Sequence, residues 1–201
     1  GRVLYELQKR DSSALKNTLM LFTSDHGDMM GDHHHWRKTY AYEGSARIPL
    51  LLSCPRDWGL GEAQVQEAPV ELRDIMPTFL DAAGVDIPDS VDGRSLLDLV
   101  RGTEGEGEEW RSFVQGEHTT CYDREHGMQY LTDGREKYIW FHHTGEEQFF
   151  DLSTDPGECT DLSKDPSVAS RLQSWRRRLA EIDENRGDPR GRDGELVVQP
   201  Q

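Results

Sequence analysis

The sequence predicts an α/β domain followed by a small subdomain made of an antiparallel sheet and one packing helix. Over the first hundred residues, short continuous apolar runs alternate with segments of helical periodicity, as in a layered α/β fold. A glycine-rich, acidic break at 102–109 then separates them from short strand-like runs. The expected division is an α/β part over 1–103, the antiparallel subdomain over 104–185, and a polar, loose tail over 186–201.

The α/β part begins with one helix and two strands. Val3–Lys9 carries apolar residues at helical spacing among charged ones, which indicates an amphipathic helix. Thr18–Thr23 and Ile48–Ser53 are almost entirely apolar. Runs of this kind are typical of strands that are buried on both faces of a parallel sheet.

Two helices follow these strands. Val70–Ala83 has helical spacing, but Pro77 lies inside it, so the helix either begins near Asp74 or is kinked at the proline. Gly84 is placed to end this helix as a C-terminal cap. A second, shorter helix is predicted within Asp92–Val100.

The second part is predicted to contain four short strands and one long helix. The turn residues Asp133-Gly134 are typical of a β-hairpin, and Val168–Ile182 has one apolar side opposite a run of arginines. The four strands are expected at Ser112–Gly116, Met128–Thr132, Lys137–His142 and Gln148–Leu152.

Charge and composition exclude some functions. The net charge of −15 disfavours nucleic acid and anionic membrane as partners, because binding phosphate groups requires clustered lysine and arginine. No apolar run is long enough to span a bilayer. Cys54, Cys121 and Cys159 are odd in number and widely spaced, which predicts free thiols rather than a disulfide framework or a zinc site.

The most informative residues follow the first predicted strand. Asp25 and His26 come directly after it, in Ser24-Asp25-His26-Gly27. In α/β sheets ligands bind at the carboxyl ends of strands, and a carboxylate with an imidazole suits Ca²⁺, Mg²⁺, Mn²⁺ or Zn²⁺. The alternative is that Asp25 caps a turn and His26 is an ordinary loop residue.

Further polar residues follow in the same loop. His33, His34 and His35 are consecutive and could be adventitious zinc ligands or a solvated cluster. On an extended chain at most two of them would serve one site, and the functional alternative is a proton donor to a leaving group. Lys38 is a compact positive charge that can hold an oxygen of a tetrahedral anion, unless it is an ordinary surface lysine. Arg47 suits either an anion or an ion pair with Glu43.

Taken together, these motifs resemble a known family. The stretch from Thr23-Ser-Asp-His-Gly through His33-His-His-Trp-Arg-Lys38 to Tyr42-Glu-Gly-Ser45 is similar to the second half of the catalytic domain of type I sulfatases, in the alkaline phosphatase superfamily. Asp92-Gly-Arg-Ser-Leu96 and Glu147–Glu158 match later parts of the same family. The resemblance covers roughly residues 1–185 and implies the C-terminal part of an alkaline-phosphatase-like sandwich sheet.

The resemblance also implies roles for individual residues. Asp25 and His26 would ligate a single divalent cation, Ca²⁺ in the first instance, with Mg²⁺ and Mn²⁺ as alternatives. His33 would lie near the bridging oxygen of the substrate, and Lys38 would contact the sulfate and assist the leaving group. The family's nucleophile is a formylglycine formed within Cys-x-Pro-x-Arg, and this motif is absent from the sequence. The nucleophile is therefore expected in a preceding N-terminal part of the catalytic domain.

The function implied by the resemblance is hydrolysis of a sulfate ester by the whole protein, with a sulfated small molecule or sugar as substrate. This chain alone is expected to be inactive. One alternative is a phosphonate monoester hydrolase or phosphodiesterase of the same superfamily, which shares the Asp-His pair and the lysine. Another is a non-catalytic interaction module that uses the acidic C-terminal subdomain.

Overall fold

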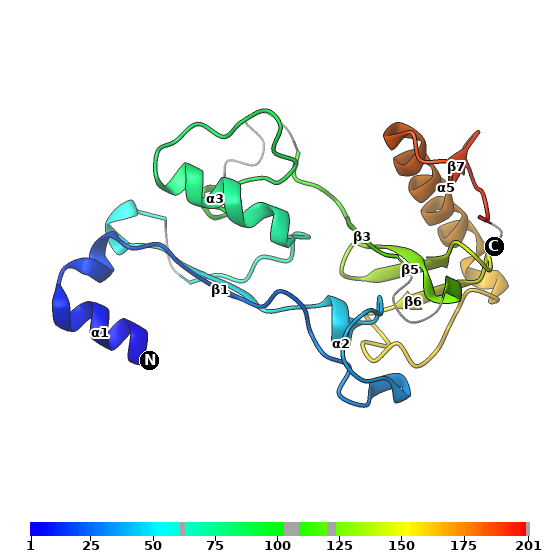
Figure 1. Cartoon of the computed structure of the whole chain (residues 1–201), viewed down its shortest axis with the longest axis horizontal. Helices are drawn as coiled ribbons and strands as arrows, with labels where there is room; N and C mark the ends of the chain where they lie inside the picture. The colour runs from blue at the N-terminus through cyan, green and yellow to red at the C-terminus, as the bar shows by residue number, and fades with distance from the viewer. Residues whose placement is uncertain (61–62, 103–108, 120–123, 200–201) are drawn as a thin grey trace. The chain divides into compact units, whose positions relative to one another are not determined.

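The computed structural model describes residues 1–60, 63–102, 109–119 and 124–199 (Figure 1). The chain divides into two compact units: Gly1–Asp25 with Ile48–Trp110, and His26–Arg47 with Arg111–Gln201. The expected boundary between 103 and 104 lies outside the described residues. The division differs from the expected one because His26–Arg47, expected within the α/β part over 1–103, belongs to the second unit.

The first unit contains a pair of strands and several helices (Figure 1). Its α-helices and strands are α1 (Arg2–Arg10), β1 (Met20–Thr23), β2 (Leu50–Ser53), α3 (Ile75–Ala82) and α4 (Leu96–Arg101). Short 3₁₀ helices lie at Ala14–Asn17, Arg56–Trp58 and Leu72–Asp74. All the predicted elements of this part are present.

The expected burial of these strands in a parallel sheet is wrong for the structure. β1 and β2 pair antiparallel, with Phe22 opposite Leu51. One face of the pair packs on α4 through Leu21 and Leu52, whereas Phe22 and Leu51 on the other face are 65% and 59% exposed. A continuous apolar run specifies neither strand direction nor how many faces of the pair are covered within the chain.

The helix with the internal proline begins at Ile75, with Asp74 as its N-cap, so the first of the two predicted alternatives is confirmed. Pro77 lies in the first turn, where its missing N–H has no intrahelical partner to lose. Asp74 is fully buried and accepts hydrogen bonds from the backbone N–H groups of Glu71 and Arg94, both at 2.9 Å. This carboxylate therefore ties the start of α3 to the approach to α4.

The second unit is built on a four-stranded antiparallel sheet in the order β3-β4-β5-β6. Its α-helices and strands are α2 (Glu43–Ala46), β3 (Val114–His118), β4 (Met128–Thr132), β5 (Glu136–Phe141), β6 (Glu147–Asp151), α5 (Ala169–Arg186), β7 (Gly191–Arg192) and β8 (Glu195–Leu196). Short 3₁₀ helices lie at Asp32–His34, Arg124–His126 and Pro166–Val168. The four predicted strands and the long helix are confirmed within a few residues.

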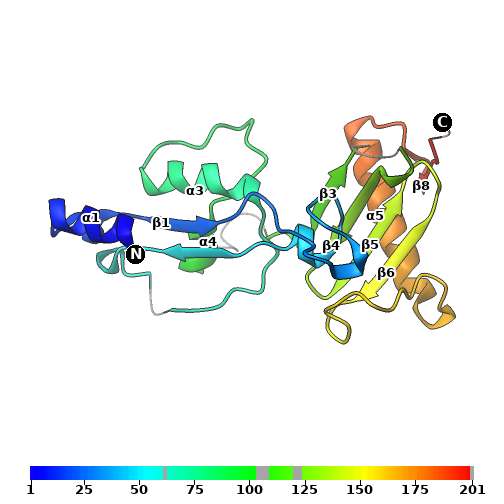
Figure 2. The ribbon, with the colours of Figure 1, turned by 60° about the horizontal axis from the view of Figure 1, so that its bottom comes forward.

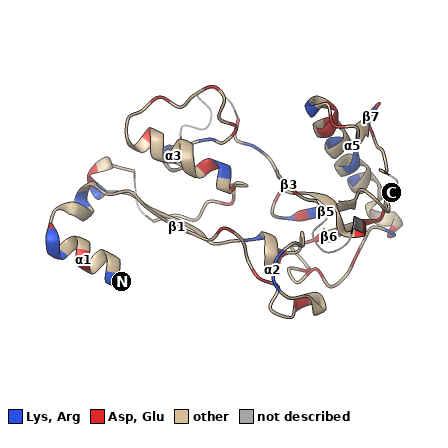
Figure 3. Cartoon of the chain, viewed as in Figure 1, with Lys and Arg blue, Asp and Glu red and all other residues tan. Residues whose placement is uncertain are grey.

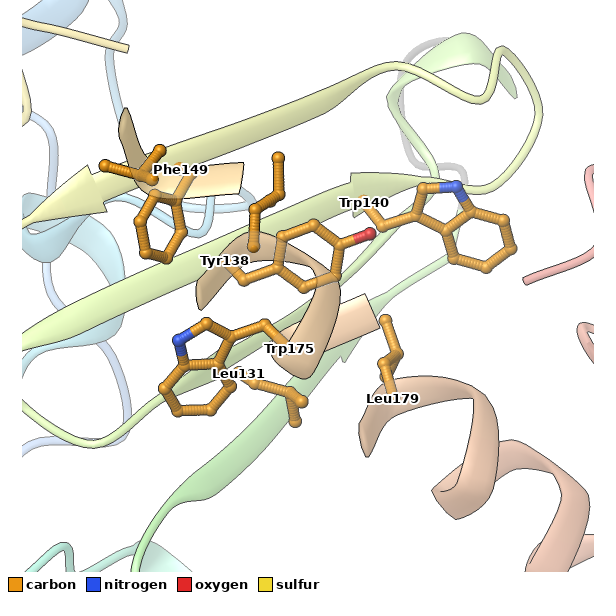
Figure 4. Close-up of a cluster of buried hydrophobic side chains, with 8 residues drawn as sticks. Leu131, Tyr138, Trp140, Phe149, Trp175 and Leu179 are labelled. Atoms are coloured by element: carbon orange, nitrogen blue, oxygen red, sulfur yellow. The ribbon is translucent and has the colours of Figure 1, made fainter. Parts of the chain in front are cut away.

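Helix α5 covers one face of this sheet (Figure 2). Residues of β4, β5 and β6 point to α5, and they meet one apolar side of the helix. Figure 4 shows the resulting core, in which Trp175 and Leu179 of α5 lie against side chains from three strands. Those strand residues are Leu131, Tyr138, Trp140 and Phe149.

The segment His26–Arg47 covers the other face (Figure 2). Tyr40, Ala41 and Tyr42 pack on the strand residues that point away from α5. Those residues include Met128, Ile139, Phe141 and Phe150. The sheet is therefore sandwiched between a helix and a loop that precedes it by many residues in the sequence.

The description of residues 186–201 as a loose tail is wrong. α5 continues to Arg186, and the hairpin β7–β8 then packs back on it. Gly191 approaches α5 so closely that an added Cβ would overlap the carbonyl oxygen of Ala180. Backbone strands of two residues each leave little local signal in a sequence, which explains the error.

Charged side chains are spread over both units, and the thiols are few. Acidic and basic residues are interspersed, and α5 carries several arginines (Figure 3). Cys54 and Cys159 are free thiols, and Cys121 lies outside the described residues. Within the described ranges, no helix combines the length and apolar character needed to cross a bilayer.

Candidate functional site

The loop that carries the predicted site residues is a closed structure. Three backbone hydrogen bonds cross it: Gly27 N–H to Ser45 O (2.9 Å), Met29 N–H to Arg37 O (2.8 Å) and Gly31 N–H to His35 O (2.9 Å). The Met29 side chain is buried. Backbone hydrogen bonds within the loop therefore hold it together, in addition to its contacts with the sheet.

Gly27 is required by a close approach between the two ends of the loop. A Cβ at this position would overlap the Gly44 carbonyl oxygen and would also lie 3.2 Å from Ser45 O. Asp28, the next residue, accepts hydrogen bonds from the backbone N–H groups of Met30 (2.9 Å) and Arg37 (3.2 Å). The residues directly after the Asp-His pair therefore fix the path of the chain on both sides of Lys38.

Asp25 and His26 lie where the first unit ends and the second begins. Asp25 is exposed, and His26 is half-buried with Nδ1 2.7 Å from Gly27 O. Because a carbonyl oxygen only accepts, Nδ1 carries a proton, so in the neutral ring Nε2 is the nitrogen with a lone pair. A histidine fixed in this tautomer by a backbone carbonyl is the form that ligates metal ions.

The donor set of the described residues is incomplete for the expected cation. Asp25 and His26 supply an oxygen and a nitrogen, whereas Ca²⁺ takes about six to eight ligands, almost all of them oxygen. Within the described part of the chain, no three His, Cys, Asp or Glu side chains are grouped to hold a metal. The pair therefore fits only part of such a site, and the other ligands would have to come from elsewhere.

The three histidines are held in different ways. The His33 ring stacks on Tyr42, with centroids 4.1 Å apart, and its Nε2 lies 3.0 Å from Gly157 O. The His35 ring stacks on Tyr40 at 4.0 Å, and burial lowers its pKa. His34 is exposed. Since His33 Nε2–H donates to Gly157 O, Nδ1 is the nitrogen left to meet a leaving-group oxygen, and it donates a proton only in the imidazolium form.

Lys38 is exposed and lies on strained backbone. Its neighbours Arg37 and Thr39 have φ values of +70° and +99°, the latter unusual for a β-branched residue. Five of the seven non-glycine residues with positive φ in the described ranges lie in this loop: Met30, His33, His34, Arg37 and Thr39. Such residues cost about 1–3 kcal/mol each and cluster at functional sites, where neighbouring contacts hold them.

Sequence reasoning missed the residues that fasten this loop to the sheet. Lys137 of β5 and Glu158 are both buried. Lys137 forms an ion pair with Glu43, Glu158 accepts a hydrogen bond from the Glu43 backbone N–H, and the Tyr42 hydroxyl donates to Gln148 (3.0 Å). The available signal was the position of Lys137, which shares a strand face with apolar Ile139 and Phe141. Arg47 pairs with Glu43 at 3.4 Å, the ion-pair alternative predicted for it.

Comparison with known proteins places these features in a family. The family model for the C-terminal part of N-sulphoglucosamine sulphohydrolase matches residues 31–185. An arylsulfatase of Clostridium perfringens is 44% identical over 180 residues, which are 89% of this chain and 36% of that protein. The chain therefore spans about a third of the length of this relative.

Solved structures agree with this comparison. The protein BT4656 in complex with its substrate D-glucosamine-2-N,6-O-disulfate aligns with a TM-score of 0.73 and 28% identity over 94% of this chain and 38% of that one. A phosphonate monoester hydrolase of Agrobacterium radiobacter aligns with a TM-score of 0.75 and 29% identity, covering 92% of this chain and 38% of the other.

Proposed function

Because the chain belongs to the N-sulphoglucosamine sulphohydrolase C-terminal family, and is the C-terminal part of a type I sulfatase, we propose that the intact protein hydrolyses a sulfate ester. The observation that carries this proposal is the family match over residues 31–185, which includes His33 and Lys38. The identity of 44% with an arylsulfatase supports the same reaction.

In this proposal Lys38 binds an oxygen of the sulfate and stabilises the negative charge that develops as the leaving group departs. Its exposure, and the strained backbone of its neighbours Arg37 and Thr39, suit a cation that must reach a substrate from a fixed position. His33 lies close to the bridging oxygen, with Nδ1 toward it and Nε2–H held by Gly157 O. Lys38 and His33 both belong to the second unit, whose contacts position them.

Asp25 and His26 are proposed as part of the ligand set of a divalent cation, Ca²⁺ in the first instance. Such an ion would supply positive charge to the sulfate oxygens. The support is the fixed tautomer of His26 and the place of the pair just after β1. The nucleophile, expected as formylglycine, and the other ligands belong to the rest of the intact protein.

The rest of that protein is also proposed to cover an apolar surface of the first unit. Phe22 and Leu51 are cross-strand partners on one face of the β1–β2 pair, and both are largely exposed. Burial of two such side chains stabilises a contact by about 1.5–3 kcal/mol each. A further layer of the catalytic domain on this face accounts for their exposure.

The substrate is proposed to be a sulfated small molecule or sugar. The support is BT4656, whose structure holds a sulfated glucosamine as substrate and whose fold matches 94% of this chain. The acidic surface argues against a nucleic-acid partner.

Substitution of Lys38 in the intact protein tests the function. We expect Lys38→Ala to lower kcat for 4-nitrophenyl sulfate by about 10²–10³-fold, the usual loss when one charge-stabilising group is removed, with little change in Tm. Lys164→Ala, at another exposed lysine of the same unit, is the matched control. Equal kinetics in the two variants would remove Lys38 from the site.

A phosphonate monoester hydrolase is the second candidate, favoured by the structural match to the enzyme of Agrobacterium radiobacter. Rates of the intact protein on 4-nitrophenyl sulfate and on a phosphonate monoester, measured side by side, separate the two. A higher kcat/KM on the phosphonate would favour this candidate. The purified 201-residue chain is expected to turn over neither ester, because its sequence contains no Cys-x-Pro-x-Arg.

A further inference from the structure

We propose that Lys137 is a positioning residue of this site, because its buried ammonium group fixes the loop that carries His33 and Lys38 to the C-terminal sheet. The inference rests on the proposed function of that loop. It assigns to the C-terminal subdomain a role in the geometry of the reaction, at a residue 94 positions from its partner Glu43 in the sequence.

The contacts of the ammonium group join two distant parts of the chain. Lys137 is completely buried, and its Nζ donates hydrogen bonds to Ala41 O (2.7 Å) and Glu43 Oε1 (2.8 Å). Glu158 Oε1 lies 2.8 Å from the same nitrogen as an ion pair. Two of these three oxygens belong to the loop, so the ammonium group keeps all three protein contacts only while the loop is docked.

The location of this lysine requires the docked loop to supply partners for its charge. Lys137 shares the loop-facing side of β5 with Ile139 and Phe141, where an ammonium group without partners would be strongly unfavourable. Here two oxygens accept hydrogen bonds from the ammonium group, and Glu158 Oε1 balances its charge as an ion pair. Release of the loop would remove both hydrogen-bonded oxygens, which links the state of the loop to the stability of the sheet.

A single turn next to the sheet holds the loop at two points. Gly157 O contacts the His33 ring at 3.0 Å, and Glu158 Oε2 accepts a hydrogen bond from the Glu43 backbone N–H at 2.6 Å. Lys38 lies midway between these two anchors, five residues from each. Since Glu158 is itself paired with Lys137, the buried lysine supports the anchor on the C-terminal side of Lys38 both directly and through Glu158.

The test compares two carboxylates in the intact protein. Glu43→Gln removes the charge that faces Lys137, whereas Glu147→Gln removes a charge on the α5 face, where Glu147 pairs with Arg176. Their side chains are 20% and 19% exposed, so the two substitutions are matched in burial. Lys137→Met is a second variant, and it is more disruptive because it leaves Glu158 buried without its counter-ion.

Two readouts are combined. In Glu43→Gln, backbone amides within 27–45 are expected to exchange with solvent roughly tenfold faster or more, because a hydrogen bond to a charged group is weakened. The kcat for 4-nitrophenyl sulfate is expected to fall by about tenfold or more with a smaller change in KM, since a displacement of about 1 Å affects the transition state most. Glu147→Gln should change neither.

A purely structural role is distinguished by a double variant. If Lys137 acts by positioning Lys38, Glu43→Gln should lower kcat much less in a Lys38→Ala background than in the wild type. Equal losses in both backgrounds would overturn the proposal, as would faster amide exchange with unchanged kcat. Failure of the proposed function is recognised separately: Lys38→Ala alone would then leave the kinetics unchanged, while the amides of the loop would still exchange faster in Glu43→Gln.

Discussion

Replacement of Gly27 by alanine offers a sharp test of how the loop is built. Gly27 lies where the two ends of the loop cross, and an added methyl group would overlap the Gly44 carbonyl oxygen. The obstacle is backbone, so no side-chain rotation relieves it. The two chain segments that cross here must move apart, and this movement first breaks the hydrogen bond from Gly27 N–H to Ser45 O (2.9 Å).

The cost follows from two contributions. Loss of one backbone hydrogen bond destabilises by about 1 kcal/mol. Forcing an extra methyl group into a packed site costs about 1–3 kcal/mol. The closed loop should therefore be destabilised by about 2–4 kcal/mol, which corresponds to roughly a 30- to 1,000-fold increase in its open population.

Hydrogen exchange of the Met29 and Gly31 amides measures this directly, because both donate hydrogen bonds within the loop. Gly44→Ala is the matched control at the same crossing. Its added methyl group would meet the Met29 sulfur at 3.3 Å, and a flexible thioether can move aside. Equal protection of these amides in Gly27→Ala and Gly44→Ala would refute the reasoning, as would full sulfatase activity in Gly27→Ala.

Three further predictions concern stability, pH and metal. Trp175→Ala should lower the free energy of unfolding of the chain by about 3–5 kcal/mol. Trp175→Phe, which mainly removes the 2.7 Å hydrogen bond from the indole to Glu136, should lower it by about 1–2 kcal/mol. Thermal unfolding followed by circular dichroism measures both losses, and similar losses would contradict the packing in Figure 4. Burial, aided by the charge of Arg190, lowers the pKa of His142 to about 4. The folded chain therefore binds fewer protons than the unfolded chain, and its free energy of unfolding should fall as pH falls from about 6.5 to 4. His142→Gln should flatten this pH dependence, and an unchanged profile would show that another group causes it. Chelation of divalent cations should abolish turnover by the intact protein, and a full rate without metal would contradict the proposed cation. Asp25→Asn should raise the Ca²⁺ concentration that gives half-maximal rate by about tenfold or more.

The sequence predicted best what local signals specify. The hairpin at Asp133-Gly134 forms between β4 and β5, with Gly134 at a φ of +86°. The apolar spacing of Val168–Ile182 likewise identified α5 and its core residues. Strand pairing and a helix stripe are encoded within a few neighbouring residues, so one sequence is sufficient to find them.

The errors and omissions concern long-range contacts. The docking of the loop depends on pairs such as Glu43 with Glu158, which are 115 residues apart, and no local pattern indicates them. The antiparallel pairing of β1 with β2 was missed because an apolar run carries no information on direction. The motif residues Asp25, His26, His33 and Lys38 were singled out by their chemistry, their place after the first strand and the resemblance to type I sulfatases, and their roles stay predictions.

The two faces of the C-terminal sheet make a separation of stability from activity testable. Lysine has a flexible four-carbon stem, so the position of the Lys38 charge depends on its backbone, and that backbone is strained and held by the loop face of the sheet. The α5 face contributes to the free energy of unfolding, whereas the anchors at Gly157 and Glu158 contact His33 and Glu43 of the loop. Substitutions that cost equal stability on the two faces should therefore lower kcat only on the loop face, at temperatures where both variants are folded. If kcat instead followed the loss of stability on either face, the sheet would support the site only by remaining folded.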